Sequence, residues 1–402
     1  GAVERLGSTY TLMSDLIVNH VSASSVPFTD WLARGARSEF DGMFLTLDSV
    51  FPDGATEADL TTIYRPRPGL PFTPYVTSDG TKRLMWTTFT GQQIDIDVEH
   101  PAGWRYLTGV LDRFARSAVS AIRLDAAGYA IKRAGTTSFM IAETFEFIGR
   151  LVEEAHRRDM EVLVEIHADA ATQADIAGRV DWVYDFVLPP LVLDALFQAD
   201  SRPLEHWLRH RPINAVTVLD THDGIGIVDV AGLLPPERID ALVEGIHDRT
   251  GGESRRATGA AASNLDLYQV NSTFFSALGG DERRYLTARA IQLFVPGVPQ
   301  VYYVGLLAGA NDMDLLGSTD VGRDINRHRY TPEEVATDLD RPVVRSLMEL
   351  LRLRADHPAF DGSFEVVGSG DHELDLSWTN GDAHAGLRVD LASGDHEIRQ
   401  RV

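Results

Sequence analysis

The 402-residue sequence contains no cysteine. Disulfide bridges, zinc sites with thiolate ligands, iron–sulfur clusters and cysteine nucleophiles are therefore all excluded. Positive charge is also scarce, because 37 Lys and Arg stand against 59 Asp and Glu and leave a net charge of −22. This balance argues against nucleic-acid binding, which needs clustered positive groups, and an anionic membrane surface would repel the chain.

Long apolar runs are absent as well. No run reaches the roughly 18 residues that suggest a membrane-spanning helix. Residues 1–20 start without an initiator Met and contain neither a basic region nor the apolar core of a signal peptide, so we expect a cytoplasmic protein. The 44% of apolar residues is ordinary for a globular protein and is enough for a large core.

Short apolar runs alternate with amphipathic helical patterns along most of the chain. The runs are residues 12–20, 120–128, 161–169, 181–189, 214–224 and 296–305. The clearest helical patterns are residues 103–118, 145–160 and 283–294. Alternation of this kind predicts parallel βα units, and a (β/α)8 TIM barrel is the closed form of that fold. Only six strand patterns are visible, so we expect an α/β barrel that lacks the first two of its eight strands.

Three segments interrupt the βα pattern and predict additional domains. Residues 21–98 are too long for a simple connection and predict an inserted domain B, and residues 224–282 predict a second inserted segment. Within residues 356–402, the three segments GSFEVV, HELDLSW and HAGLRVDL alternate apolar and polar side chains between turns, which predicts a C-terminal antiparallel β domain. The barrel itself would then consist of residues 1–20, 99–223 and 283–355.

Carboxylates end three of the apolar runs. Side chains two apart on a strand point the same way, which pairs Arg123 with Asp125, Glu165 with His167, and Asp220 with His222, with Asp223 next in line. In a barrel the C-terminal strand ends converge on one mouth, where active sites lie. Taken separately, each carboxylate also has a structural alternative. Asp125 would cap a helix or pair with Arg123, and Glu165 would be a solvated charge at a strand end. Asp223 would be a turn residue before Gly224.

Converging carboxylates suit retaining glycosyl transfer, which needs an ionised nucleophile and a protonated acid. Arg123 favours the anionic form of Asp125, as a nucleophile requires. Glu165 has only His167 beside it and follows an apolar stretch, so a raised pKa and an acid/base role are expected. Retention further predicts a separation of roughly 5–6 Å between these two carboxyl groups.

At this point the sequence resembles a known family. DLIVNH, IRLDAAG, VLVEIH and VLDTHDG are similar to the four signature segments of the α-amylase superfamily, glycoside hydrolase family 13. RPRPGLPFTPY, GESRRATGAAASNLDLYQVN, FVPGVPQVYYVGLLAGANDMDLL and GRDINRHRY resemble the sucrose phosphorylase branch. The resemblance extends over most of the chain, from about residue 10 to about residue 365.

The resemblance implies roles for individual residues. Asp125 would be the nucleophile, Glu165 the general acid/base, and Asp223 the stabiliser of the transition state. Residues holding the glucosyl ring would be His20, Arg123 and His222, with Phe89 and Tyr129 as apolar walls. The site shared by fructose and phosphate would be formed by Arg67, His167, Leu265, Asp266, Gln269 and Arg323.

The implied reaction converts sucrose and phosphate to α-glucose 1-phosphate and fructose through a covalent glucosyl-enzyme. No cofactor is implied, and no metal, although Asn19 resembles a calcium ligand of true amylases. The partners would be these small molecules, and a homodimer is an open alternative to a monomer. Rival readings are a phosphorylase for glucosylglycerate or sucrose 6′-phosphate, an α-glucosidase, and an inactive amylase-like protein.

Two departures from the family pattern keep the last alternative open. Members of the family carry an additional strand, helix and strand before DLIVNH, with an Asp in an Asp-His-Thr context that contributes to the donor site. This tripeptide does not occur in the sequence. The segment after GIGIVDV is also shorter than is usual in the family, because AGLLPPER follows at once.

Overall fold

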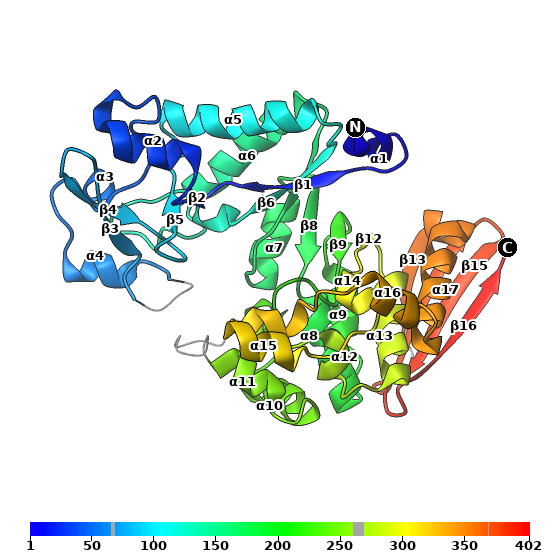
Figure 1. The fold of residues 1–402 in the computed structure, drawn as a ribbon. Coiled ribbons are helices and arrows are strands. Elements are labelled where there is room, and N and C mark those ends of the chain that lie inside the picture. The colour runs from blue at the N-terminus through cyan, green and yellow to red at the C-terminus, as the bar shows by residue number, and fades with distance from the viewer. Residues whose placement is uncertain (66–68, 260–268, 369) are drawn as a thin grey trace. The chain divides into compact units, whose positions relative to one another are not determined.

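The computed structural model describes residues 1–65, 69–259, 269–368 and 370–402 (Figure 1). The chain divides into two compact units. The first contains residues 1–166 and 176–183, and the second contains residues 167–175 and 184–402. Parallel strands and helices occur in both units, so the division runs through the βα pattern.

The first unit contains the parallel strands β1, β6, β7 and the first half of β8, in this order. Their bounds are Met13–Ile17, Ala121–Asp125, Glu161–Val164 and Trp182–Asp185. The register aligns Ile17 with Asp125 and Leu124 with Val164, so the strands end at a common edge. β6 and β7 are buried over most of their length, as expected of central parallel strands.

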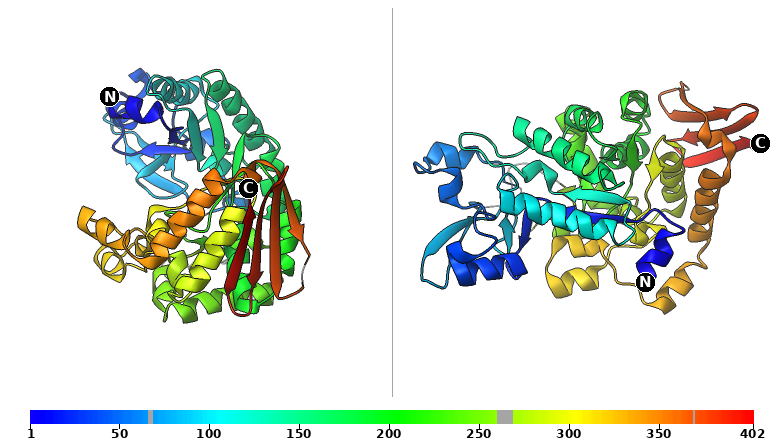
Figure 2. Two further views of the ribbon diagram at one scale, coloured as in Figure 1. Left: turned by 90° about the vertical axis from the view of Figure 1, so that its right-hand side faces the viewer. Right: turned by 90° about the horizontal axis from the view of Figure 1, so that it is seen from above.

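Helices α5 (Pro101–Ala115) and α6 (Ala142–His156) follow the patterns predicted over 103–118 and 145–160. The ring of His100 caps α5 by accepting the Ala102 N–H, and Pro at the first helical position has no N–H to leave unpaired. α5 lies beside β1 and α6 (Figures 1 and 2). The shorter elements of this part of the chain are α1 (Ala2–Gly7), η2 (Ala127–Tyr129) and α7 (Ala170–Ala177).

Residues 20–98 contain two small antiparallel sheets and short helices. The sheets pair β2 (His20–Ser22) with β5 (Gln93–Asp95) and β3 (Phe72–Val76) with β4 (Lys82–Trp86). The helices are α2 (Val26–Arg34), η1 (Gly35–Arg37), α3 (Leu47–Val50) and α4 (Glu57–Thr62). Trp86 packs with Phe51 and Leu45 in a core cluster confined to this segment, which is why it can be compact without a barrel strand.

In the second unit, the parallel strands continue with the rest of β8, then β9 (Ala215–Thr217) and β12 (Val298–Pro299). Around them lie the helices α8 (Leu188–Gln198), α9 (Arg202–His210), α13 (Glu282–Phe294), α14 (Tyr303–Leu306), α15 (Met313–Thr319), α16 (Pro332–Asp338) and α17 (Pro342–Asp356). α8 and α13 are buried along most of their length and form the centre of one large apolar core.

The remaining elements of the second unit fall in two groups. Between β9 and α13 lie β10 (Ile225–Gly226), η3 (Val228–Val230), α10 (Pro236–Arg249), α11 (Glu253–Gly259), β11 (Gln269–Val270) and α12 (Phe274–Ala277). Beyond α15 lie η4 (Gly322–Asn326) and η5 (Pro358–Asp361). β10 and β11 pair antiparallel and place Gly226 opposite Gln269, which joins the start of this segment to its end.

A four-stranded antiparallel sheet ends the chain, drawn from orange to red in Figure 2. Its strands, in order, are β13 (Ser363–Val367), β14 (Glu373–Asn380), β15 (Ala383–Asp390) and β16 (Asp395–Arg401). The buried Trp378 donates its indole N–H to the Phe294 carbonyl of α13, so the sheet packs on the core of its own unit. The alternation predicted three of these strands and missed β16, whose side chains are mostly polar.

The predicted fold class is confirmed. Six parallel strands lie within the described residues, each inside one of the six predicted apolar runs, and an antiparallel sheet follows them. The strands are shorter than the runs, because their polar ends belong to the loops that follow. Within the described ranges, every helix is too short or too polar to traverse a bilayer. The predicted domain boundaries stay predictions.

Candidate active site

Two of the predicted carboxylates lie at the ends of neighbouring parallel strands. Asp125 is the last residue of β6, and Glu165 directly follows β7 and donates its backbone N–H to the Leu124 carbonyl (3.2 Å). Arg123 places one guanidinium nitrogen 3.3 Å from Asp125 Oδ1 and uses the other in an ion pair with Glu165. A single buried guanidinium therefore contacts both carboxyl groups.

This shared arginine corrects part of the sequence argument. The sequence predicts Arg123 beside Asp125 and only His167 beside Glu165, whereas Arg123 also pairs with Glu165. A neighbouring positive charge favours the ionised form of any carboxyl group, so Arg123 by itself does not set the two pKa values apart. Arg123 is also 3.0 Å from Asp15, a residue of β1. The division of roles between Asp125 and Glu165 and their predicted separation stay predictions.

An aromatic wall lies next to these strand ends in the first unit. The chain turns at Ala126, whose backbone is left-handed (φ 56°), and enters the short helix that carries Tyr129. Phe89 packs edge-on against Tyr129 (5.2 Å between ring centroids) and against His20 (5.3 Å). Burial lowers the pKa of His20, although Asp95 and Asp125 oppose the shift. This shift favours the neutral imidazole of His20.

A buried ammonium group lies against Asn19, the residue that resembles a calcium ligand. Lys132 Nζ donates to Asn19 Oδ1 (2.5 Å) and to the Tyr129 carbonyl, and it is 2.7 Å from Asp95 Oδ2. Burial lowers the pKa of Lys132, and the Asp95 carboxylate opposes this effect. These oxygens already surround a cation supplied by the chain, so they do not fit a second one.

In the second unit, Asp223 is held among basic side chains. Asp223 Oδ1 is 2.7 Å from Arg323, 3.4 Å from Arg327 and 3.7 Å from the ring of His222. Burial by itself would raise the pKa of Asp223, but Arg323, His222, His167 and Arg327 outweigh it and leave the pKa below its usual value. The geometry keeps a carboxylate ionised in a mostly buried position.

The loop after β9 departs from the alternation that the sequence predicted. β9 ends at Thr217, so Asp220, His222 and Asp223 are not strand residues. Asp220 is buried in an ion pair with Arg289, whereas the side chain of His222 is about half exposed. Side chains two positions apart share a face only while the chain remains extended, and here it does not.

Other predicted acceptor-site residues also gather in this unit. Gln269 Nε2 is 3.2 Å from the ring of His167, and its carbonyl oxygen is 3.4 Å from Arg323. Arg67, Leu265 and Asp266 lie outside the described residues, so their predicted roles stay untested. Glu165 belongs to the first unit and His167, two residues later, to the second.

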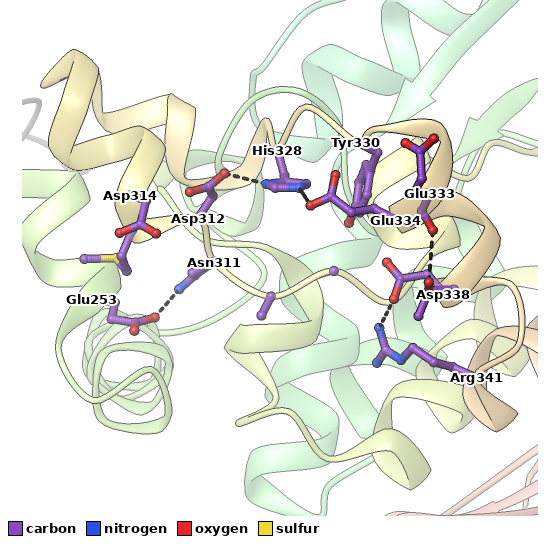
Figure 3. Close-up of a pocket in the computed structure, with 14 residues that line it drawn as sticks. Glu253, Asn311, Asp312, Asp314, His328, Tyr330, Glu333, Glu334, Asp338 and Arg341 are labelled. Atoms are coloured by element: carbon purple, nitrogen blue, oxygen red, sulfur yellow. Dashed lines mark hydrogen bonds and ion pairs between the residues drawn. The ribbon is translucent and has the colours of Figure 1, made fainter.

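Hydrogen bonds and ion pairs at several points hold the segment that carries Arg323. Asn326 donates to the Asp223 carbonyl (2.7 Å), and Arg327 donates to the His222 carbonyl (2.8 Å). At its far end, His328 lies between Asp312 (2.6 Å) and Glu334 (3.5 Å) (Figure 3). His328 therefore connects the caps of α15 and α16 and anchors this segment.

A separate pocket of about 770 Å³ opens beside His328 (Figure 3). Its charged lining is mainly acidic, namely Glu253, Asp312, Asp314, Glu333, Glu334 and Asp338, with Arg341 as the one arginine among the lining residues. It contains none of the residues that the sequence singled out. Carboxylates that already pair with His328 and Arg341 do not by themselves define a ligand.

Several side chains at the site are not indicated by the sequence motifs. Arg327 and Asn326 are in the same GRDINRH motif as Arg323, so proximity to that residue was an available signal. No local sequence pattern indicates Lys132 or Asp229, because each of them contacts a residue that is far away in the sequence. Asn19 and Lys132 are 113 positions apart, and His167 and Asp229 are 62 apart.

Known proteins resemble this chain over nearly its whole length. No family model matches the chain. It is 56% identical over 403 residues to a sucrose phosphorylase of Agrobacterium vitis, covering 98% of this chain and 83% of that protein. The crystal structure of a sucrose 6F-phosphate phosphorylase from Thermoanaerobacter thermosaccharolyticum superposes with a TM-score of 0.93 at 36% identity, covering 99% of this chain and 82% of that one. An α-amylase from H. orenii (TM-score 0.64, 14% identity, 97% of this chain and 74% of that one) is similar in fold alone.

Proposed function

Because the chain belongs to the sucrose phosphorylase family of glycosyl-transferring enzymes with an α-amylase-type fold, we propose that it transfers a glucosyl group from sucrose to phosphate with retention. The products are α-glucose 1-phosphate and fructose. The observation that carries this proposal is the pair of carboxyl groups, Asp125 and Glu165, that one guanidinium contacts at the ends of two neighbouring strands. Retaining transfer requires two carboxyl groups close together.

In the first half-reaction, Asp125 attacks the anomeric carbon of the glucosyl group while the bond to the fructosyl oxygen breaks. Glu165 donates its proton to that oxygen, and fructose leaves. Arg123 supports this step, because it favours the ionised form of Asp125. Because Arg123 also pairs with Glu165, Glu165 can donate a proton only after substrate binding changes the contacts of the guanidinium and Glu165 becomes protonated.

In the second half-reaction, a phosphate oxygen attacks the same carbon and the ester to Asp125 breaks. Glu165, now a carboxylate, accepts the proton of the attacking group. Two inversions give net retention. Asp223 would stabilise the oxocarbenium-like transition state, and its depressed pKa supports this role because the group stays anionic at neutral pH.

The remaining site residues would bind the two substrates. His20, Arg123 and His222 would hold the glucosyl hydroxyls against the aromatic wall of Phe89 and Tyr129. Arg323, Gln269 and His167, together with Arg67, Leu265 and Asp266, would form the acceptor site. An arginine suits phosphate because its planar guanidinium donates to two oxygens at once. In the ligand-free geometry Arg323 neutralises Asp223, so phosphate would compete for it.

The test is incubation with sucrose in the presence and absence of phosphate, followed by measurement of glucose 1-phosphate, fructose and free glucose. We expect glucose 1-phosphate only with phosphate, and slow release of glucose without it. Asp125→Asn should abolish fructose release in both conditions, and Glu165→Gln should allow a glucosyl adduct to be detected by mass spectrometry. A chain that releases glucose at one rate regardless of phosphate is a hydrolase, and a chain without turnover is the inactive alternative.

The proposal implies small molecules as partners: sucrose, phosphate, fructose and glucose 1-phosphate. Replacement of sucrose by sucrose 6′-phosphate or a glucosylglycerate in the same assay separates the related phosphorylases. The homodimer and the cytoplasmic location remain predictions.

A further inference from the structure

The pair of buried residues His167 and Asp229 lies behind the predicted acceptor site. Asp229 is fully buried in η3, and its carboxylate oxygen is 2.9 Å from Nδ1 of His167. The other oxygen accepts a hydrogen bond from Gln173 Nε2 (3.0 Å). Asp229 therefore contacts the edge of the imidazole from a fully buried position.

We propose that Asp229 is a positioning residue that fixes the tautomer and orientation of His167 and, through His167, aligns Gln269 and Arg323 for the acceptor. This inference rests on the proposed function. It extends that function to Asp229, six positions after Asp223, for which the sequence motifs predict no role.

The direction of each hydrogen bond follows from the chemistry of the groups. An ionised carboxylate only accepts and a guanidinium only donates. Burial raises the pKa of Asp229, and the contact with His167 opposes this shift. With Asp229 ionised, His167 carries its proton on Nδ1, facing Asp229, and Gln269 turns its oxygen toward Arg323. Gln269 Nε2 then donates to the lone pair on His167 Nε2 (3.2 Å). One set of donors and acceptors satisfies the whole chain from Asp229 to Arg323, which in turn pairs with Asp223.

The ring of His167 is held from its face as well. Phe186 stacks on it at 3.9 Å between ring centroids with an interplanar angle of 11°, and Tyr184 stacks on Phe186 at 4.8 Å. The hydroxyl of Tyr184 donates to Gln300 (3.1 Å). Stacking fixes the plane of the imidazole, but it leaves the ring free to flip, and the contact with Asp229 removes that freedom.

Because residue 226 is glycine, the Asp229 carboxylate can approach the His167 ring closely. A Cβ atom at this position would be 2.0 Å from the Asp229 carboxylate and 3.2 Å from His167 Nδ1. Any side chain there would push the carboxylate away from the ring. The space next to Gly226 is therefore occupied by the Asp229 carboxylate that contacts His167.

The decisive variant is Asp229→Asn, compared with His167→Ala and with the double variant. The amide group cannot accept from both Gln173 and His167 without placing one of its own N–H groups against a donor. We expect the yield of glucose 1-phosphate relative to free glucose to fall about tenfold or more, as is typical when the partner that orients a functional histidine is lost, with a smaller change in fructose release. The double variant should be no worse than His167→Ala, because the two residues act as one unit.

Asp194→Asn is the matched control, because Asp194 is another buried carboxylate of the second unit and pairs with Arg238. Circular dichroism measures the folded fraction of each variant, and the product ratios are compared at equal concentrations of folded protein. The proposal is overturned if Asp229→Asn keeps the parental product ratio, if its effect multiplies with that of His167→Ala, or if Asp194→Asn changes the ratio equally.

A second measurement decides the matter without turnover. The ¹⁵N shifts of the His167 ring, assigned by their loss in His167→Ala, should show the proton on Nδ1 in the parent. They should show a mixture of tautomers in Asp229→Asn and in Gly226→Ala. Unchanged shifts in both variants overturn the proposal. If the parental chain makes no glucose 1-phosphate, the proposed function fails, whereas the tautomer result still decides the role of Asp229.

Discussion

At the scale of single residues, the contact between Arg323 and Asp223 is the clearest link between charge and chemistry. A phosphate anion entering a protein of net charge −22 needs local positive groups. Replacement Arg323→Ala should reduce the ratio of glucose 1-phosphate to glucose by about ten- to hundred-fold at fixed phosphate, the loss of one charge-assisted hydrogen bond of about 1.5–3 kcal/mol. Product analysis from sucrose measures this ratio. An unchanged ratio would mean that Arg323 does not carry phosphate.

The same replacement has a second consequence, which concerns pH. The folded-state pKa of Asp223 is depressed, so its contribution to stability is present above the unfolded-state pKa and is lost as pH falls through the folded-state pKa. Without Arg323 the depression shrinks, and acid unfolding of the second unit should begin at higher pH. Arg327→Ala is the matched comparison, and it should move the transition less because its contact is longer (3.4 against 2.7 Å).

At the scale of elements, Lys132 connects the inserted segment, residues 21–98, to the parallel sheet. It pairs with Asp95 of β5 and donates to Asn19, which follows β1. Replacement Lys132→Met would leave the Asp95 carboxylate buried without its cation. We expect the free energy of unfolding of the first unit to fall by about 3–5 kcal/mol, the usual result of breaking a buried pair from one side. Denaturant unfolding monitored by tryptophan fluorescence measures the change.

The double variant Lys132→Met with Asp95→Asn is the control for this prediction. Because it removes both charges, it should recover a substantial part of the lost stability. Thr88 also hydrogen-bonds to Asp95, and this contact limits full recovery. If the single and double variants are equally unstable, the pair is not what holds β5 in place.

At the scale of the whole molecule, the excess of acidic groups is the dominant electrostatic feature. Self-repulsion in a chain of net charge −22 opposes the compact state, and salt screens it. Raising the concentration of a neutral salt from low to physiological ionic strength should therefore raise Tm by a few degrees, about 2–4 °C for each kcal/mol gained. Differential scanning calorimetry measures Tm, and a nonionic solute at equal osmolality is the control. A Tm that falls with salt would show that attractive pairs outweigh the repulsion.

The accuracy of the sequence-based predictions depended on how local the evidence was. Arg123 and Asp125 lie on one face of β6, as their spacing predicted, because the strand includes both. The same reasoning failed for Asp220 and His222, because the apolar pattern does not show that β9 stops at Thr217. β16 was missed for the related reason that an edge strand with polar side chains has no apolar alternation to detect.

By itself, the sequence determined the α/β class, the six parallel strands, the C-terminal sheet and the family, because periodicity and long motifs are properties of neighbouring residues. Only the tertiary structure decided which charges meet. Arg123 serves two carboxyl groups, Lys132 lies among three oxygens, and Asp229 holds His167. Such contacts join residues on different elements, and their geometry depends on how strands and loops pack, which local sequence patterns do not encode.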